Sequence, residues 1–176
     1  VNDSFIGFLI DPYVWEHDGT VIDDNPSGYS YKTISIDSDT VIGSSMIAAV
    51  VYNGSLSVRN SSIWALILLN DSQAIVNDSM ITYILGYDLA YVDVTNTTFL
   101  TQFDDNGIVL FNNASAVISN SLNLSDINMF NYSSIELVNL TIQHIWLYNY
   151  STAHLTNIYV ENDIGLEDYS IIIGNN

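Results

Sequence analysis

The chain has 176 residues, of which 48% are apolar and 12% charged, and its formal net charge is −18 at pH 7. This composition excludes a disordered acidic tail, and the length suffices for one domain with a core. Two basic residues cannot neutralise a phosphate backbone, so nucleic-acid binding is not expected. A helix that spans a bilayer needs about 20 apolar residues, and every apolar run of this sequence is much shorter.

Residues 1–32 lie outside the pattern that organises the rest of the chain. FIGFLI at positions 5–10 is typical of an apolar strand, and the Asp-Pro pair that follows ends it. We therefore divide the chain into an N-terminal capping or donor-strand segment, 1–32, and a repetitive domain, 33–176.

From residue 33 onward the sequence repeats every 17–23 residues. Segments such as VRNSSI (58–63), VTNTTF (94–99) and LVNLTI (137–142) align on a polar residue that follows an aliphatic residue by two positions and precedes an apolar one by three. The aligned polar column contains Ser38, Asn60, Asn77, Asn96, Ser119, Asn139, Asn157 and Asn175.

A second polar column marks another turn in each period. Between the two turns lie short stretches rich in Val, Ile, Tyr and Thr with alternating apolar residues, which predict strands. Asn and Asp tolerate the left-handed backbone conformation that a sharp corner needs. The second column contains Asn53, Asn70, Asp88, Asn112, Asn131, Asn149 and Asp168.

These features predict an all-β fold, a parallel β-helix (β-solenoid) of about eight rungs with a ladder of Asn side chains at a buried corner. In rung length and Asn ladder, residues 33–176 resemble the right-handed parallel β-helices of the pectin-lyase-like class, of the kind found in archaeal and bacterial surface proteins. The resemblance implies a fold and not an activity. A β-sandwich with fortuitous periodicity is the alternative.

Eleven N-x-S/T sequons suggest N-linked glycans on an extracellular or cell-surface protein. For the ladder Asn residues the alternative is purely structural, since an inward side chain cannot carry a glycan and the Ser or Thr belongs to the turn. The better candidates are Asn53, Asn70, Asn113, Asn123, Asn131 and Asn149.

The resemblance also implies an enzymatic alternative, because many such β-helices cleave acidic polysaccharides. Their chemistry needs clustered Asp with Arg or Lys, or neighbouring acids on one outer face. Here Asp37, Asp93 and Glu136 fall two or more rungs apart, roughly 10 Å, which is too wide for a retaining pair and marginal for an inverting one. We expect no enzyme and no catalytic residues.

The stretch FDDNG (103–107) lengthens one rung and supplies oxygen ligands at turn spacing. Asp104, Asp105 and Asn106 would suit calcium, the one metal cofactor that the sequence suggests. A solvated turn is the alternative and the preferred interpretation.

The run IWLY (145–148) is apolar at every position, so one outer face of the solenoid is apolar whichever parity the strands adopt. If Ile145 and Leu147 point inward, the outer face, which we call the assembly face, consists of Tyr52, Leu69, Tyr87, Phe111, Phe130, Trp146 and Tyr148. The opposite parity would expose Leu68, Ile84 and their equivalents instead. Residues 1–32, a neighbouring subunit or a sugar could cover this face, and protein is favoured.

The sequence ends in IIIGNN, part way into a rung and without a capping repeat. We expect either a longer solenoid or a neighbouring subunit that continues it head to tail. The residues expected at such a joint are Phe5, Ile6, Phe8, Leu9, Ile10, Ile171, Ile172 and Ile173.

Together these features predict an extracellular structural protein, a β-helical subunit that assembles with itself into a surface filament, sheath or S-layer. The composition favours an archaeal source, and other cell-surface proteins or glycans are further expected partners. The alternative is a carbohydrate-binding or polysaccharide-cleaving module, as in an adhesin or a tailspike.

Overall fold

The computed structural model describes residues 15–16, 30–35, 38–43, 45–100 and 107–175. The strands are β1 (Trp15–Glu16), β2 (Ser30–Ser35), β3 (Ser38–Ile42), β4 (Ser45–Tyr52), β5 (Ser55–Arg59), β6 (Ser62–Leu69), β7 (Gln73–Asn77), β8 (Met80–Gly86), β9 (Tyr91–Thr95), β10 (Thr98–Phe99), β11 (Gly107–Leu110), β12 (Ser115–Ser119), β13 (Leu124–Met129), β14 (Ser134–Leu147), β15 (Thr152–Val160), β16 (Ile164–Leu166) and β17 (Ile171–Asn175).

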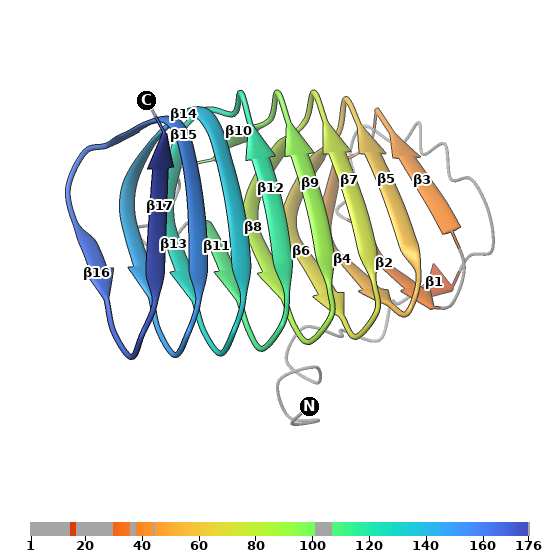
Figure 1. The fold of residues 1–176 in the computed structure, drawn as a ribbon. Helices are drawn as coiled ribbons and strands as arrows, with labels where there is room; N and C mark the ends of the chain where they lie inside the picture. The colour runs from red at the N-terminus through yellow and green to blue at the C-terminus, as the bar shows by residue number, and fades with distance from the viewer. Residues whose placement is uncertain (1–14, 17–29, 36–37, 44, 101–106, 176) are drawn as a thin grey trace.

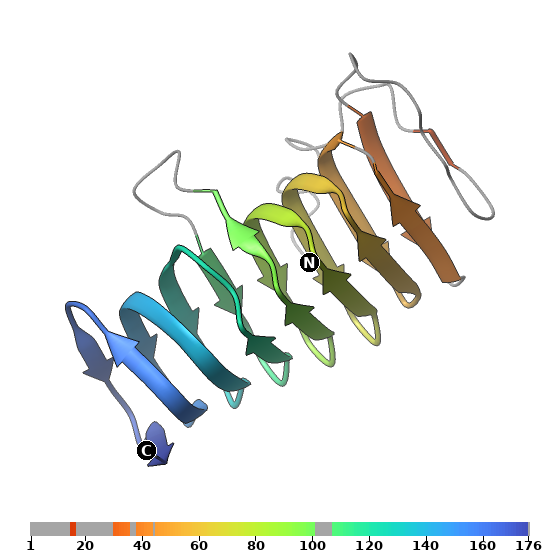
Figure 2. The same ribbon diagram turned by 90° about the horizontal axis from the view of Figure 1, so that it is seen from above.

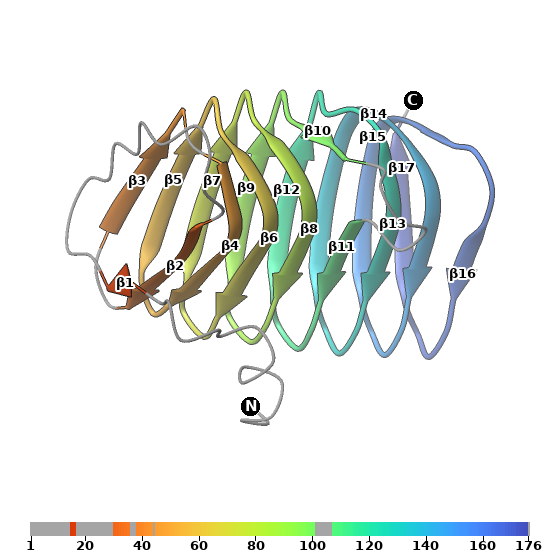
Figure 3. The same cartoon turned by 180° about the vertical axis from the view of Figure 1, so that it is seen from behind.

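The strands form a parallel β-solenoid of about seven turns, which confirms the predicted fold (Figure 1). Sheet 2, toward the viewer in Figure 1, stacks β3, β5, β7, β9, β12, the first half of β14, β15 and β17. Sheet 1, toward the viewer in Figure 3, stacks β1, β2, β4, β6, β8, β11, β13, the second half of β14 and β16. Viewed from above, the chain advances one turn at a time along a single axis (Figure 2).

Each turn has two sharp corners where the backbone enters the left-handed region. The first corner follows sheet 2 and has φ between 48° and 65°, and the second follows sheet 1 with φ between 49° and 62°. The first corner is formed by Gly43, Asn60, Asp78, Asn96, Asn120, Asn139 and Asn157. The second corner is formed by Asn53, Asn70, Asp88, Asn112, Asn131, Asn149 and Asp168, the second polar column of the sequence.

The predicted ladder column needs correction at four positions. Ser38 pairs with Ser55 at the start of β3, five residues before the corner residue Gly43. Asn77 pairs with Arg59, and Asn175 pairs with Thr156, so both stand one residue before the first corner, as Ser119 does. Asp78 and Asn120 occupy the corner instead. A corner is defined by its backbone conformation, and an alignment of Asn letters cannot separate neighbouring positions that both carry polar residues.

The ladder itself lies on the outside of the corner and not at a buried position. At the first corner, Nδ2 of Asn157 donates to Oδ1 of Asn139 at 2.9 Å, and Nδ2 of Asn139 donates to Oδ1 of Asn120 at 3.2 Å. The second corner carries a ladder of its own, in which Asn149 donates to Asn131 at 3.1 Å. That ladder continues through Asn112 to Asp88.

Small hydroxyl side chains, and not Asn, fill the inside of the first corner over the earlier rungs. Each hydroxyl donates to the carbonyl two residues earlier, as Ser79 does to Asn77 at 2.7 Å. It also accepts across rungs, since the backbone N–H of Ser61 donates to Oγ of Ser79 at 3.2 Å. These bonds satisfy backbone groups that the corner would leave buried. The hydroxyl column is Ser61, Ser79, Thr97 and Ser121.

The core is a column of aliphatic residues between the two sheets, extended by Phe99. The side chains of sheet 1 that point into it are Val51, Leu66, Leu68, Ile84, Ile108, Leu110, Ile127, Met129, Ile145 and Leu147, all exposed by 1% or less. Ile145 and Leu147 therefore point inward, and the opposite parity considered for IWLY is wrong.

One rung carries an extra residue just after the first corner. Ser119 pairs with Val138, 19 positions on, whereas Leu124 pairs with Ile142, only 18 positions on. The additional residue forms a bulge in which Asn123 has φ 60°, and Leu122 is 64% exposed.

Five residues of the segment 1–32 are described, namely Trp15 and Glu16 in β1 and Ser30, Tyr31 and Lys32 in β2. Trp15 and Glu16 pair with Lys32 and Thr33, so β1 extends sheet 1 by one strand. The predicted boundary between residues 32 and 33 falls within β2, and the rest of the segment 1–32 lies outside the described residues. In the part of the chain that the structure describes, no helix is long and apolar enough to cross a membrane.

Candidate functional site

The assembly face predicted from the sequence lies on the outer side of sheet 1. Tyr87, Phe111, Phe130 and Tyr148 form one continuous ring stack there, with centroids 4.7, 4.9 and 4.8 Å apart and interplanar angles of 6°, 11° and 4°. The stack runs parallel to the solenoid axis, because each ring comes from the same register position in successive rungs.

The exposure of this face varies along its length. Tyr52 is 41% exposed, whereas Leu69 is only 5% exposed and belongs to a second apolar cluster with Ile67 and Leu85. The cluster packs outside the core against half-buried neighbours that include Tyr87 and Phe111. The face is thus partly closed by its own side chains.

Trp146 lies on this face but outside the ring stack. A Cβ at Gly165 would lie 1.9 Å from Cε3 of Trp146, so the indole ring lies directly over the backbone of β16. The absence of a side chain at Gly165 allows this approach. Trp146 therefore holds the last strand of sheet 1 against the solenoid from outside.

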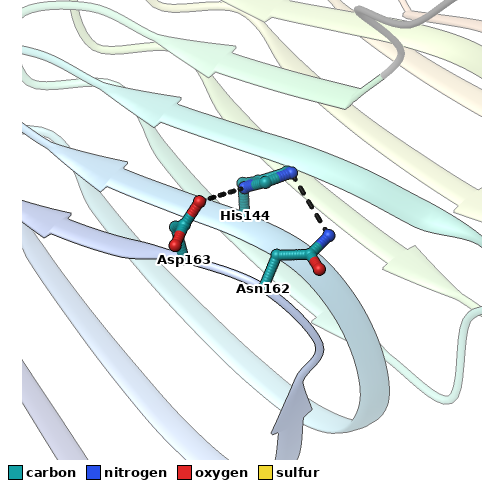
Figure 4. Close-up of polar contacts among 3 residues, drawn as sticks. All are labelled: His144, Asn162 and Asp163. Atoms are coloured by element: carbon teal, nitrogen blue, oxygen red, sulfur yellow. Dashed lines mark hydrogen bonds and ion pairs between the residues drawn. The ribbon is translucent and has the colours of Figure 1, made fainter.

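His144, two residues before Trp146, contacts the same final segment (Figure 4). Its Nδ1 lies 3.6 Å from Oδ2 of Asp163, and its Nε2 lies 3.4 Å from Nδ2 of Asn162. The arrangement suits an imidazole that carries its proton on Nδ1 and accepts at Nε2. His144 and Trp146 together attach the segment before β16 and β16 itself to β14.

The last described rung presents apolar side chains and a strand edge that no described strand occupies. Ile171 is 53% exposed and Ile173 is 44% exposed, and Ile172 is half-buried against the core. On sheet 1 the equivalent residues are Ile164 and Leu166, each 49% exposed. The C-terminal half of the predicted joint is therefore accessible, while Phe5, Ile6, Phe8, Leu9 and Ile10 lie outside the described residues.

A second tyrosine stack follows the second corner. Tyr132, Tyr150 and Tyr169 stack with centroids 5.1 and 5.2 Å apart, and they are exposed by 63%, 49% and 79%. The sequence contained the signal for this stack in its N-Y-S and D-Y-S turns, but the prediction did not include it. Rings stacked face to face present their edges to solvent, so neither stack offers a row of open ring faces.

The six candidate glycosylation sequons fall into two groups in the structure. In those of Asn70, Asn131 and Asn149 the serine two positions on is buried inside the second corner, so the N-x-S pattern has a structural cause. Asn53, Asn113 and Asn123 are exposed, and no side-chain hydrogen bond joins them to the described residues. Glycosylation stays a prediction, and these three positions fit it best.

The outer side of sheet 2 carries the two predicted carboxylates that can be placed. Asp93 and Glu136 stand in one column with Val117 between them, two rungs apart as expected. Burial raises the pKa of the neighbouring Tyr91 phenol, and the charges of Asp93 and Glu136 raise it further.

This environment predicts an alkaline loss of stability. Below pH 10 both states keep the phenolic proton, but above it the unfolded chain loses the proton first, so the free energy of unfolding falls as pH rises through the folded-state pKa. We expect Tyr91→Phe to show a smaller fall than wild type between pH 9.5 and about 11.5 in urea unfolding. Tyr169→Phe, which removes an exposed hydroxyl, should behave as wild type, and equal pH curves for all three proteins would contradict the assignment.

Asp37 and the proposed calcium ligands Asp104, Asp105 and Asn106 lie outside the described residues. Within the described part of the chain, no group of three or more His, Cys, Asp or Glu side chains could hold a metal ion. Comparison with protein-family models, with curated proteins and with solved structures found no match.

Proposed function

We propose that this protein is an extracellular, non-enzymatic structural solenoid that assembles end to end with copies of itself into a surface filament, sheath or S-layer. The observation that carries the proposal is the last rung, where β16 and β17 combine exposed apolar side chains with a strand edge that no described strand occupies.

The backbone of β17 alternates between two sides. The N–H of Ile171 donates to the carbonyl of Ser151 at 3.0 Å, so the peptide groups of Ile171 and Ile173 face β15. Those of Ile172 and Gly174 face the other way, where a further parallel strand could bond to them. A rung from a second copy would continue sheet 2 in the same manner.

The core at this end also supports an added rung. Leu155, Ile158, Val160 and Ile172 are only half-buried, whereas Leu137 and Ile142, which hold equivalent positions one rung earlier, are fully buried. Another rung would remove this apolar surface from water, and such burial stabilises the contact by roughly 25 cal/mol per Å² of apolar area.

Charge should govern the conditions for assembly. Glu161, Asp163, Glu167 and Asp168 are exposed on the last rung of a chain whose net charge is −18. Like charges repel across an end-to-end contact, and salt screens them. We expect assembly to be stronger at high ionic strength.

Gly174 offers a matched pair of variants to test the proposal. A Cβ at Gly174 would meet nothing within 4 Å, so Gly174→Ala should assemble like wild type. Gly174→Pro removes an N–H that faces the open edge while leaving the bonds to β15 in place. By electron microscopy and sedimentation, wild type and Gly174→Ala should form uniform fibres, and Gly174→Pro should stay dispersed with an unchanged circular dichroism spectrum.

Two results would contradict end-to-end assembly. One is wild-type protein that remains dispersed at micromolar concentration and high salt. The other is Gly174→Pro protein that forms the same fibres as Gly174→Ala.

A further inference from the structure

A groove with a volume of about 820 Å³ runs along the first corner over the C-terminal rungs. It belongs neither to the assembly face nor to the last strand edge. A second groove, about 580 Å³, lies on the same corner beside Asn60, Asp78 and Asn96. The residues that line the larger groove include Leu122, Asn123, Asn139, Asn157 and Tyr159.

The bulge after the first corner shapes one end of the larger groove. Its extra residue directs Leu122 outward, where the side chain is 64% exposed, and places Asn123 beside it in the left-handed conformation. Bulges of this kind re-aim side chains and are enriched next to binding sites. The rungs that follow lack it, since β14 and β15 pair without a shift from Leu140 to Ile142.

The ladder amides form one side of the groove and retain unused hydrogen-bonding capacity. Asn139 uses one amide N–H toward Asn120 and accepts one bond from Asn157. A carboxamide has two N–H donors and two lone pairs on its oxygen, so each ladder amide can still donate and accept once. Groups that donate and accept side by side match the vicinal hydroxyls of a sugar.

Tyr159 supplies an open ring face at the other end of the groove. It is 66% exposed, and among the described aromatic rings it stacks on none. Tyr150, by contrast, has rings on both faces. The apolar face of a pyranose could therefore stack on Tyr159 and contact Leu122.

The charge and the backbone narrow the class of ligand. Glu161 lines the groove, and the net charge of −18 repels polyanions such as polyuronates. The backbone of β14 in the groove already bonds to β15 and the segment after it, as the carbonyl of Ile142 does with the N–H of Glu161 at 2.8 Å, so an extended peptide could pair only at the edge of β15.

We propose that this corner groove binds a neutral oligosaccharide, with Tyr159 stacked on a pyranose ring and the amides of Asn139 and Asn157 bonded to sugar hydroxyls. The site is separate from the ring stacks of the outer faces, and its Tyr159 end borders the edge of β15 on which an added rung would stack.

Calorimetric titration of the full chain with linear hexamers of glucose, of mannose and of N-acetylglucosamine tests the site, with a galacturonic acid hexamer as the charged counterpart. We expect at least one neutral hexamer to bind and the acidic one not to bind. Tyr159→Ala should weaken the binding about tenfold. Tyr169→Ala, which removes an exposed tyrosine at the second corner and outside the groove, should leave the binding unchanged.

Side-chain amide resonances provide a readout that does not depend on a variant. On addition of the bound hexamer, the NH₂ signals of Asn139 and Asn157 should shift, while those of Asn131 and Asn149 at the second corner should not. A specific site of this size should bind with a dissociation constant below about 10 mM. The proposal is therefore overturned if no neutral hexamer binds at a concentration of about 10 mM. Preferential binding of the acidic hexamer or of an extended peptide, or shifts confined to the second corner, would overturn it as well.

Discussion

Replacing Gly107 by alanine should destabilise the solenoid by about 3 kcal/mol or more. A Cβ at this position would lie 1.8 Å from the carbonyl oxygen of Asp126 in the next rung. That atom belongs to the backbone, so the clash cannot be relieved by a rotamer change, and β11 and β13 would have to move apart. Their pairing from Gly107 to Leu110 would weaken as a result.

Urea unfolding followed by circular dichroism measures this effect directly. Gly174→Ala is the matched control, because its added methyl group meets nothing within 4 Å and should change the free energy of unfolding by less than about 0.5 kcal/mol. A loss below about 1 kcal/mol for Gly107→Ala would show that the rungs do not approach each other as closely as the structure has them.

The second large effect concerns the two sides of the solenoid wall. Phe99 is fully buried in the core, so Phe99→Ala should lower the free energy of unfolding by about 3–5 kcal/mol. Phe130 has the same size but lies half-buried in the outer ring stack between Phe111 and Tyr148. Its replacement by alanine should remove only roughly 1–2 kcal/mol, from partial burial and two ring contacts.

Thermal or urea unfolding of the two alanine variants compares these positions in one experiment. Equal losses would mean that Phe130 is as fully enclosed as Phe99, and the outer face would then not be a surface in solution. A larger loss for Phe99 alone agrees with the observed inward and outward alternation. The same pair measured after assembly would show whether Phe130 becomes buried in a filament.

Much of the architecture could be predicted because a solenoid repeats its environment along the chain. An inward position in one rung is inward in the next, so aliphatic residues such as Leu137 and Leu155 recur at the rung interval. The corners recur for the same reason, because each needs a residue that accepts positive φ. The pattern of IWLY left open which of its residues point inward. The burial of Ile145 and Leu147 in the core shows that Trp146 and Tyr148 point outward.

The sequence by itself thus determined the fold, the second corner column, half of the first corner column and an apolar outer face. Only the tertiary structure decided the corner residues at Asp78 and Asn120, the outward direction of the Asn ladder and the enclosure of Leu69. It also decided that a single extra residue near Asn123 opens a groove opposite Tyr159. These features depend on register between rungs and on contacts perpendicular to the chain, which a periodic pattern along one dimension does not specify.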